Sequence, residues 1–382
     1  MIYLDNNATT PLDPAVVEKM AWFIREHFGN PSSLYPLGRT VKDIMTEARE
    51  TVAGSLGAGA AELIFTGSGT ESDNFAIRGF FEASPDKNEL ITSTIEHPAV
   101  YETAKYLQKK GVKVTFVPVD SNGLVDLDFL ERSISPKTGL ISIMHANNEI
   151  GTVQPIRKIV DIARKNGVPV HTDAVQTFGK KPLDVKDLGV DYLSVSAHKI
   201  YGPKGVGALY IRRGAAISPI IFGGHQEHRL RAGTENTPGI VGFGEAVRVL
   251  NERQDDDNRR LAELAAALKK GIEQKIPHVK FNGHPEHRIN STVNFAFPGI
   301  EAEAILLALA TKDICVSTGS ACSEGGEEVS QVLSSIGVKP EIARSSIRMS
   351  LGRFNTAEDI ETVLNILPDI VRNFREISAL DI

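Results

Sequence analysis

Short apolar runs alternate with amphipathic stretches along the first two thirds of the chain. Runs such as Leu63–Thr66 have the length and composition of buried strands, while Pro14–His27 has apolar residues at helical spacing. The strands expected in this way are 63–66, 90–93, 112–119, 140–144, 168–171 and 192–195, and the helices are 14–27, 39–56, 73–81, one from 97, 127–133 and 156–166. This alternation predicts an α/β fold with a mainly parallel sheet flanked by helices.

The last third of the chain has a different order of elements, which predicts a smaller α+β domain. We expect strands at 289–297, 314–317 and 346–351, and helices at 301–311 and 357–376. The charge run Glu252–Asp257 lies between two helical stretches, 242–251 and 258–274, and we interpret it as a solvated hinge. The prediction is therefore a large domain of residues 15–254 and a small domain of residues 1–14 and 255–382.

Polar residues follow two of the apolar runs where the expected strands end. Asp173 and Gln176 follow the first run, and Ser196, His198 and Lys199 follow the second. Ligands of open α/β sheets bind beyond the carboxyl ends of the strands, so both groups should face one crevice. A carboxylate that keeps a pyridine nitrogen protonated, and a lysine that forms a Schiff base, are what pyridoxal phosphate requires. Taken singly, Asp173 could instead cap a helix and Lys199 could be a solvated loop residue.

Three further strand ends carry candidate site residues. The run 67–72, GSGTES, lies between a strand and a helix, so Gly69 and Thr70 are candidates for a phosphate cradle. The alternative is a capping box in which Ser68 or Thr70 satisfies the first helical turn. His97 could cap a helix or stack on a flat cofactor, and Asn148 follows another strand.

Two segments without hydrophobic periodicity are expected to be loops. The stretch 223–237 is rich in Gly, Arg and Thr, and its Arg229 and Arg231 could bind an anion or form a solvated face. The glycine-rich stretch 318–328 contains Cys322, which has no apolar neighbours and is therefore a candidate nucleophile. Cys315, in the apolar run ICVS, fits a structural cysteine.

Composition and charge narrow the class of protein. The chain has 382 residues, 41% of them hydrophobic, and a net charge of −6, which disfavours a nucleic-acid partner. Two cysteines form no disulfide framework, no stretch is apolar enough to span a membrane, and the amino terminus does not resemble an export signal. We expect a cytoplasmic protein without a metal site. The GPKGVG turn precedes a strand rather than following one, so no dinucleotide site is indicated.

The chain resembles a cysteine desulfurase of the NifS/IscS type, within the fold-type I, class V group of pyridoxal-phosphate enzymes. The resemblance runs almost end to end. It rests on YLDNNATTP, FGNPSSLY, TGSGTESDN, EHPAV, NNEIGT, HTDAVQ, SAHKIYGPKGVG, GGHQEHRLRAGTEN, STGSACSEG and SIRMSLGRF. The long glycine-rich loop is similar to that of the long-loop subgroup.

The resemblance implies a role for each candidate residue. In the cofactor site, Lys199 binds the aldehyde and later moves the substrate Cα proton, Asp173 pairs with the ring nitrogen, His97 stacks on the ring and Gln176 reaches the ring hydroxyl. The phosphate would be held at Gly69 and Thr70, by Ser196 and His198, and by Thr234 from the other subunit of a homodimer. Asn148 and Arg348 would orient the substrate, and Cys322 would become a persulfide.

The implied reaction converts L-cysteine to L-alanine and passes the sulfur through Cys322 to an iron–sulfur scaffold protein or another acceptor. Many relatives carry Pro and His after the cysteine loop, where this chain has Val329 and Gln331. Two alternatives stay open. Another class V enzyme, such as an aminotransferase or selenocysteine lyase, would not require Cys322, and a cofactor-bearing scaffold without turnover would not require Lys199.

Overall fold

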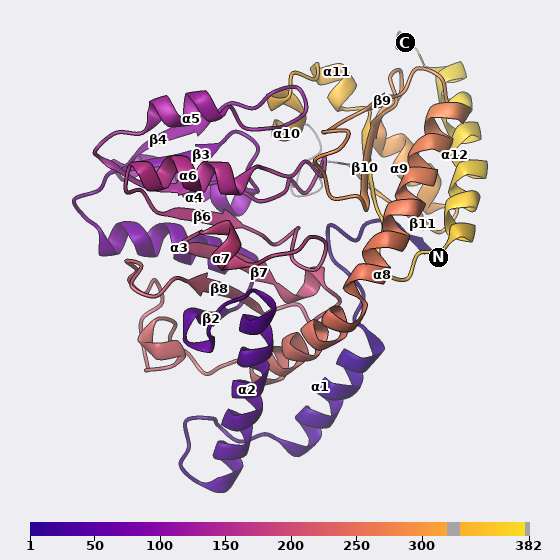
Figure 1. Ribbon diagram of the computed structural model, residues 1–382. Helices are drawn as coiled ribbons and strands as arrows, with labels where there is room; N and C mark the ends of the chain where they lie inside the picture. The colour runs from indigo at the N-terminus through magenta and orange to yellow at the C-terminus, as the bar shows by residue number, and fades with distance from the viewer. Residues whose placement is uncertain (319–328, 379–382) are drawn as a thin grey trace.

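The computed structural model describes residues 1–318 and 329–378, and its largest sheet has seven strands (Figure 1). The strand order is β2-β8-β7-β6-β5-β3-β4. These strands are β2 (Leu63–Thr66), β3 (Glu89–Ser93), β4 (Lys113–Val117), β5 (Thr138–Ser142), β6 (Val170–Asp173), β7 (Tyr192–Ser196) and β8 (Gly207–Ile211). Only β8 runs antiparallel to its neighbours, so the prediction of a mainly parallel sheet is confirmed.

Both faces of this sheet are covered by helices, as expected for parallel strands. Successive strand residues point to opposite faces, so Leu90 packs with one hydrophobic cluster and Ile91 with another. The first face is covered by α3 (Gly69–Ala83) and α4 (Pro98–Lys109). The other face packs against a cluster to which α2 (Pro36–Ser55), α6 (Ile156–Lys165) and the first part of α8 (Thr237–Lys275) contribute. The remaining helices of this part are α1 (Pro14–Glu26), α5 (Leu127–Ser133) and the short α7 (Val185–Leu188).

The carboxyl-terminal part forms an antiparallel sheet of order β12-β13-β10-β9, backed by helices. Its elements are β9 (Lys280–Phe281), β10 (Thr292–Ala296), α9 (Ala302–Ala310), β11 (Ile314–Cys315), β12 (Ser317–Thr318), α10 (Gln331–Ser335), α11 (Pro340–Ala343), β13 (Ser346–Ser350) and α12 (Ala357–Ile377). The amino-terminal strand β1 (Ile2–Tyr3) pairs with β11, and Leu4 is buried in the same core. The first residues of the chain therefore pack with its last third.

The expected hinge at Glu252–Asp257 is wrong, because α8 is one continuous helix of 39 residues. Charged residues without Gly or Pro are compatible with a helix, and here they pair at helical spacing. Arg248 lies 2.5 Å from Glu252, and Arg260 lies 3.7 Å from Asp257. Figure 1 shows α8 passing from α1 and α2 to α12. The buried residues that α8 contributes to the first cluster end at Leu250, and those in the second begin at Leu261. This change of core supports the two-domain division, which stays a prediction.

No helix within residues 1–318 and 329–378 is long and apolar enough to cross a membrane.

Candidate active site

The polar residues after β6 and β7 lie at one edge of the sheet, as the sequence predicts. Asp173 is the last residue of β6 and pairs with Ser194, while Ser196 ends β7 and is followed by a 3-10 helix, Ala197–Lys199. The Asp173 Oδ1 atom accepts a hydrogen bond from the Val175 amide at 2.9 Å, within a turn and not at the start of a helix, so the alternative that Asp173 caps a helix is wrong. Burial raises the pKa of Asp173, and nearby His97 and Lys199 oppose that shift. A protonated ring nitrogen would stabilise the ionised form further.

Lys199 is held by the amino-terminal segment rather than by solvent. Its side chain is half-buried, and its Nζ donates to the backbone carbonyl of Asn7 and, at 2.7 Å, to that of Ala8. His198 contacts the same amino-terminal segment, because its Nδ1 lies 3.2 Å from the hydroxyl of Thr9. The hypothesis of a freely solvated loop lysine is therefore wrong.

The turn before α3 combines the two interpretations that the sequence left open. Ser68 caps the helix, because its Oγ accepts from the Glu71 amide at 3.0 Å. Within the described residues, no acceptor contacts the amides of Gly69 or Thr70, which are oriented as the first amides of α3. The Ser196 hydroxyl is buried without a partner among those residues, and a Cβ at Gly69 would lie 3.6 Å from the Cβ of Ser196. These donors fit a phosphate group.

Thr70 and His97 line one pocket of about 450 Å³. The His97 Nδ1 accepts from the Ala99 amide at 3.1 Å, so His97 caps α4, as one of the two interpretations predicted. Burial lowers the pKa of His97, and Lys199 lowers it further, against the opposing effect of Asp173. A neutral imidazole with Nδ1 as acceptor carries its proton on Nε2. Stacking of this ring on a cofactor stays a prediction.

The loop after β8 is attached to the phosphate-cradle turn. The Arg231 Nε donates to Glu71 Oε1 at 2.8 Å, and Glu71 Oε2 accepts from the Gly67 amide at 2.8 Å. Arg231 is thus paired with a carboxylate, which disfavours the interpretation that it binds an external anion. A second ion pair of 2.5 Å joins Arg49 to the buried Glu227 in the same loop. Thr234 is exposed on this loop.

Arg348, on β13, is buried close to the other candidate residues. Its Nη1 donates to the Asn148 carbonyl at 3.1 Å, and its Nη2 lies 2.6 Å from Asp5 Oδ1. The Arg348 Nε is buried without a partner among the described residues. Asp5 therefore holds the guanidinium in place, and a substrate carboxylate would have to join or replace that contact.

Cys322 lies outside the described residues, as does the rest of 319–328. The residues on either side are described. Ser317 pairs with Arg348 in the β12–β13 ladder, so the last described residues before 319 lie beside the predicted carboxylate-binding residue. On the other side, the Gln331 side chain donates to the Thr94 carbonyl at 2.8 Å, and Val329 packs against a small apolar cluster. Cys315, expected to be buried, is half-buried.

The segment after the loop is also anchored on a buried acid, Glu149. The Ser330 hydroxyl donates to Glu149 Oε2 at 2.6 Å. Burial raises the pKa of Glu149 to about 7, although the Ser330 hydrogen bond and Arg348 act in the opposite direction. Because the folded state favours the protonated form, this group contributes stability below its ordinary pKa of about 4.5 that is lost as the pH rises through about 7.

Glu149→Gln should remove this pH dependence. We expect the melting temperature of the variant, relative to wild type, to increase between pH 5 and pH 8, because the amide cannot ionise. Differential scanning calorimetry at pH 5, 6, 7 and 8 measures the difference. Other buried acids titrate in both proteins, so the comparison isolates Glu149. Glu131→Gln, at an exposed position on α5, is the control and should show no such trend. A wild-type-to-variant difference that is constant with pH contradicts the prediction.

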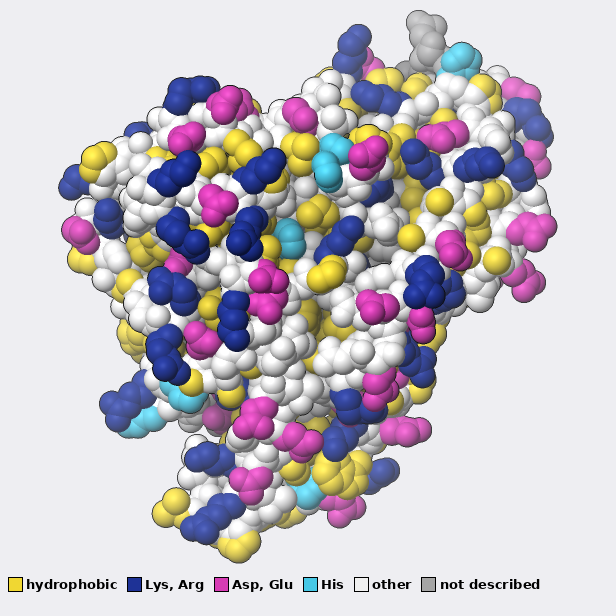
Figure 2. All heavy atoms as spheres, in the orientation of Figure 1, with side chains coloured by type: hydrophobic (Ala, Val, Ile, Leu, Met, Phe, Trp, Pro, Cys, Tyr) yellow, Lys and Arg dark blue, Asp and Glu magenta, His cyan; other side chains and the backbone are white. Residues whose placement is uncertain are grey.

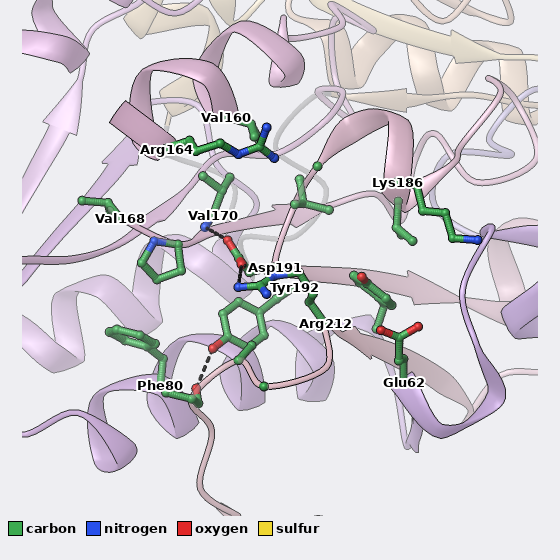
Figure 3. Close-up of a pocket in the computed structure, with 18 of the residues that line it drawn as sticks. Glu62, Phe80, Val160, Arg164, Val168, Val170, Lys186, Asp191, Tyr192 and Arg212 are labelled. Carbon is green, nitrogen blue, oxygen red and sulfur yellow. Dashed lines mark hydrogen bonds and ion pairs between the residues drawn. The ribbon is translucent and has the colours of Figure 1, made fainter. Parts of the chain in front are cut away.

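A cavity of about 740 Å³ lies elsewhere (Figure 3). It is lined by Val170 and Tyr192, the first residues of β6 and β7, and therefore lies at the opposite edge of the sheet from Asp173 and Ser196. Asp191 in its wall is paired with Arg212 at 2.6 Å. None of the site residues predicted from the sequence lines it. The volume of this cavity is therefore no guide to where the candidate site residues lie.

Two residues that hold the site together were missed by sequence analysis. The sequence patterns single out neither Asn7 nor Lys180. In the structure Asn7 contacts Lys180, Lys199 and Gln176 through its side chain or carbonyl. No local signal marks such contacts, because Asn7 lies more than 160 residues before its partners in the chain.

Comparisons with known proteins agree with this geometry. The family model described as aminotransferase class-V matches residues 2–363. A cysteine desulfurase IscS of Methanosarcina thermophila is 50% identical over 99% of this chain and 94% of that protein, and one of Dictyoglomus turgidum is 48% identical over 99% and 96%. Among solved structures, a NifS-like protein superposes with a TM-score of 0.92 at 41% identity, covering 97% of this chain and 99% of the other. A structure described as SspA in complex with cysteine has a TM-score of 0.83 at 36% identity, with coverage of 93% and 100%.

Proposed function

This chain belongs to the cysteine desulfurases of the class-V aminotransferase family, and we propose that it performs that reaction at the group of polar residues that follows the ends of β6 and β7. The enzyme converts L-cysteine to L-alanine and transfers the sulfur to a cysteine of its own, supplying iron–sulfur cluster assembly. The observation that carries the placement is the pair Asp173 and Lys199 at adjacent strand ends, beside open phosphate-binding donors.

Enzymes of this family use pyridoxal phosphate, and the donor set at this site fits it. The cofactor supplies an aldehyde that reacts with amines and a ring that accepts electrons from the substrate Cα. We assign covalent attachment to Lys199 and the proton of the ring nitrogen to Asp173. The phosphate would be held by the hydroxyls of Thr70 and Ser196, the amide of Gly69 and the imidazole of His198. His97 would stack on the ring, and Gln176 would donate to its hydroxyl.

Three residues would carry the chemical steps. Arg348, held by Asp5, orients the substrate carboxylate together with Asn148. The amine of Lys199 removes the Cα proton and returns protons to the carbon skeleton. The thiolate of Cys322 attacks the substrate sulfur. An S–S bond forms as the Cβ–S bond breaks, and the released electron pair stays with the carbon skeleton, which takes up protons to become alanine.

A homodimer would complete the phosphate site, with Thr234 supplied by the partner. The exposed position of Thr234 supports this, as does an apolar tip at the α1–α2 connection. Phe28 and Leu34 at this tip are 81% and 82% exposed, and Figure 2 shows hydrophobic side chains at the end of this projection. Large exposed apolar side chains grouped in this way are typical of contact surfaces.

The identity of the sulfur acceptor is a further part of the proposal. An iron–sulfur scaffold protein is the expected acceptor. Val329 and Gln331 stand in the segment after the loop, where many relatives carry Pro and His.

The two domains proposed are residues 15–254 and residues 1–14 with 255–382. A cytoplasmic location stays a prediction.

The purified protein, loaded with pyridoxal phosphate, tests the proposal directly. We expect a yellow protein that sediments as a dimer and releases equimolar alanine and sulfide from L-cysteine under reductant. An aminotransferase would form a keto acid instead of alanine, and a non-catalytic scaffold would bind the cofactor without turnover. Either of those results would refute the assignment.

A further inference from the structure

A second lysine, Lys180, lies in the predicted site. It follows Gly179, whose φ of 79° turns the chain back after β6. The Lys180 Nζ donates to Asn7 Oδ1 at 3.0 Å and to Gln176 Oε1 at 3.2 Å. Lys180 is therefore bound to the very side chain that is proposed to reach the cofactor ring.

The chemistry of a lysine determines how the two amides must face. The ammonium group of a lysine is only a hydrogen-bond donor, whereas an amide side chain has one oxygen acceptor and one NH₂ donor. Both amide oxygens must therefore point toward Lys180. The Gln176 NH₂ group is left facing the site, where it donates to the Asn7 carbonyl at 3.0 Å. Without Lys180, both amide oxygens would lose this donor, and each amide would keep its orientation only through the acceptors that its NH₂ group contacts.

The same orientation extends to the substrate side of the site. With its oxygen on Lys180, Asn7 directs its NH₂ group to the Asn148 carbonyl at 3.0 Å and the Thr292 hydroxyl at 2.9 Å. The Asn148 carbonyl also accepts from Arg348. The Asn7 carbonyl accepts from Lys199 as well as from Gln176. Lys180 thus fixes a residue shared by the cofactor side and the carboxylate side.

We propose that Lys180 is a positioning residue of the desulfurase, which fixes the amide orientations of Gln176 and Asn7 so that the Gln176 NH₂ group is the donor presented to the cofactor hydroxyl. This inference rests on the proposed function. Burial, together with the nearby Lys199 and Arg348, lowers the pKa of Lys180 to about 7. Because a neutral amine still donates hydrogen bonds, the orientation does not depend on the charge of Lys180.

Lys180→Met tests the inference, with Lys181→Met as the matched control. Lys181 is the next residue and half-buried, but it makes no side-chain hydrogen bond to the described site residues. In the holoenzyme of Lys180→Met we expect the cofactor to stay attached, since Lys199 is intact. The pH at which its visible band changes should shift by about half a unit or more, and kcat should fall about tenfold, as for the loss of one buried hydrogen bond. Lys181→Met should match wild type in both.

A double-mutant cycle separates positioning from general damage. In a Gln176→Leu background the amide is gone, so Lys180→Met should shift the band little further. An unshifted band in Lys180→Met, or an equal shift in both backgrounds, would overturn the inference. If Lys180→Met does not fold, Lys180→Ala, which also lacks a donor, replaces it, and the same two criteria apply. A wild-type protein that binds no cofactor or forms no alanine refutes the proposed function instead.

Discussion

Lys199→Ala should fold and lose the covalent cofactor together with alanine formation from cysteine. The expected loss in rate is a thousandfold or more, because general acid–base catalysis by one side chain contributes about 10²–10⁴ and covalent attachment is lost as well. The physical reason lies in the placement of Lys199. Lys199 follows β7, which pairs with the strand that ends at Asp173, and the Asn7 and Ala8 carbonyls hold its amine. Its charge acts on the pKa values of both Asp173 and His97.

Borohydride reduction followed by peptide mapping measures the attachment point. In wild type the reduced cofactor should be found on the peptide that contains Lys199. Lys180 is a stringent internal control for the labelling of Lys199. Its amine is also buried at the site, and its pKa is lowered to about 7. Label on Lys180, or on any lysine other than Lys199, contradicts the assignment. Lys181→Ala should keep both the label and the activity.

Cys322→Ser should separate the chemistry of the cofactor from the transfer of sulfur. None of the residues assigned to the cofactor lies in 319–328, so the variant should stay yellow, and adding cysteine should still change its spectrum. Alanine and sulfide release should fall below detection, because a serine hydroxyl does not accept sulfur as a thiolate does. Mass spectrometry should find a persulfide on wild type and none on the variant.

The state of the Cys322 thiol adds a second expectation. A free thiol has a pKa of about 8.5, and the neighbours Glu324, Glu327 and Glu328 in the sequence disfavour ionisation. Activation should therefore depend on entry into the cationic site near Lys199 and Arg348. Cys315→Ser is the control, because Cys315 belongs to β11 and its loss should change stability at most. If Cys322→Ser still forms alanine at a near-normal rate, the sulfur-transfer mechanism fails and another class V reaction takes its place.

Local patterns predicted most of the elements, because each strand and helix carries its own hydrophobic period. The strand 63–66 and the helix 127–133 lie where expected. The hinge in α8 was wrong for a physical reason. A run of charges is equally compatible with a solvated loop and with a helix whose charges pair at i+3 and i+4. The choice depends on the two cores that α8 joins, and these are formed by residues far away in the chain.

The amino-acid pattern alone was enough to predict the fold class and the sheet edge at which the candidate residues lie, because parallel strands place all their carboxyl ends together. It also determined the candidate chemistry, since residues such as Asp173 and Lys199 directly follow strands. Only the tertiary structure decided how these residues are held. Asp5 pairs with Arg348, and Asn7 joins Lys180 to Gln176. Such contacts depend on where the amino-terminal segment crosses the sheet edge, and no local preference of the chain encodes that path.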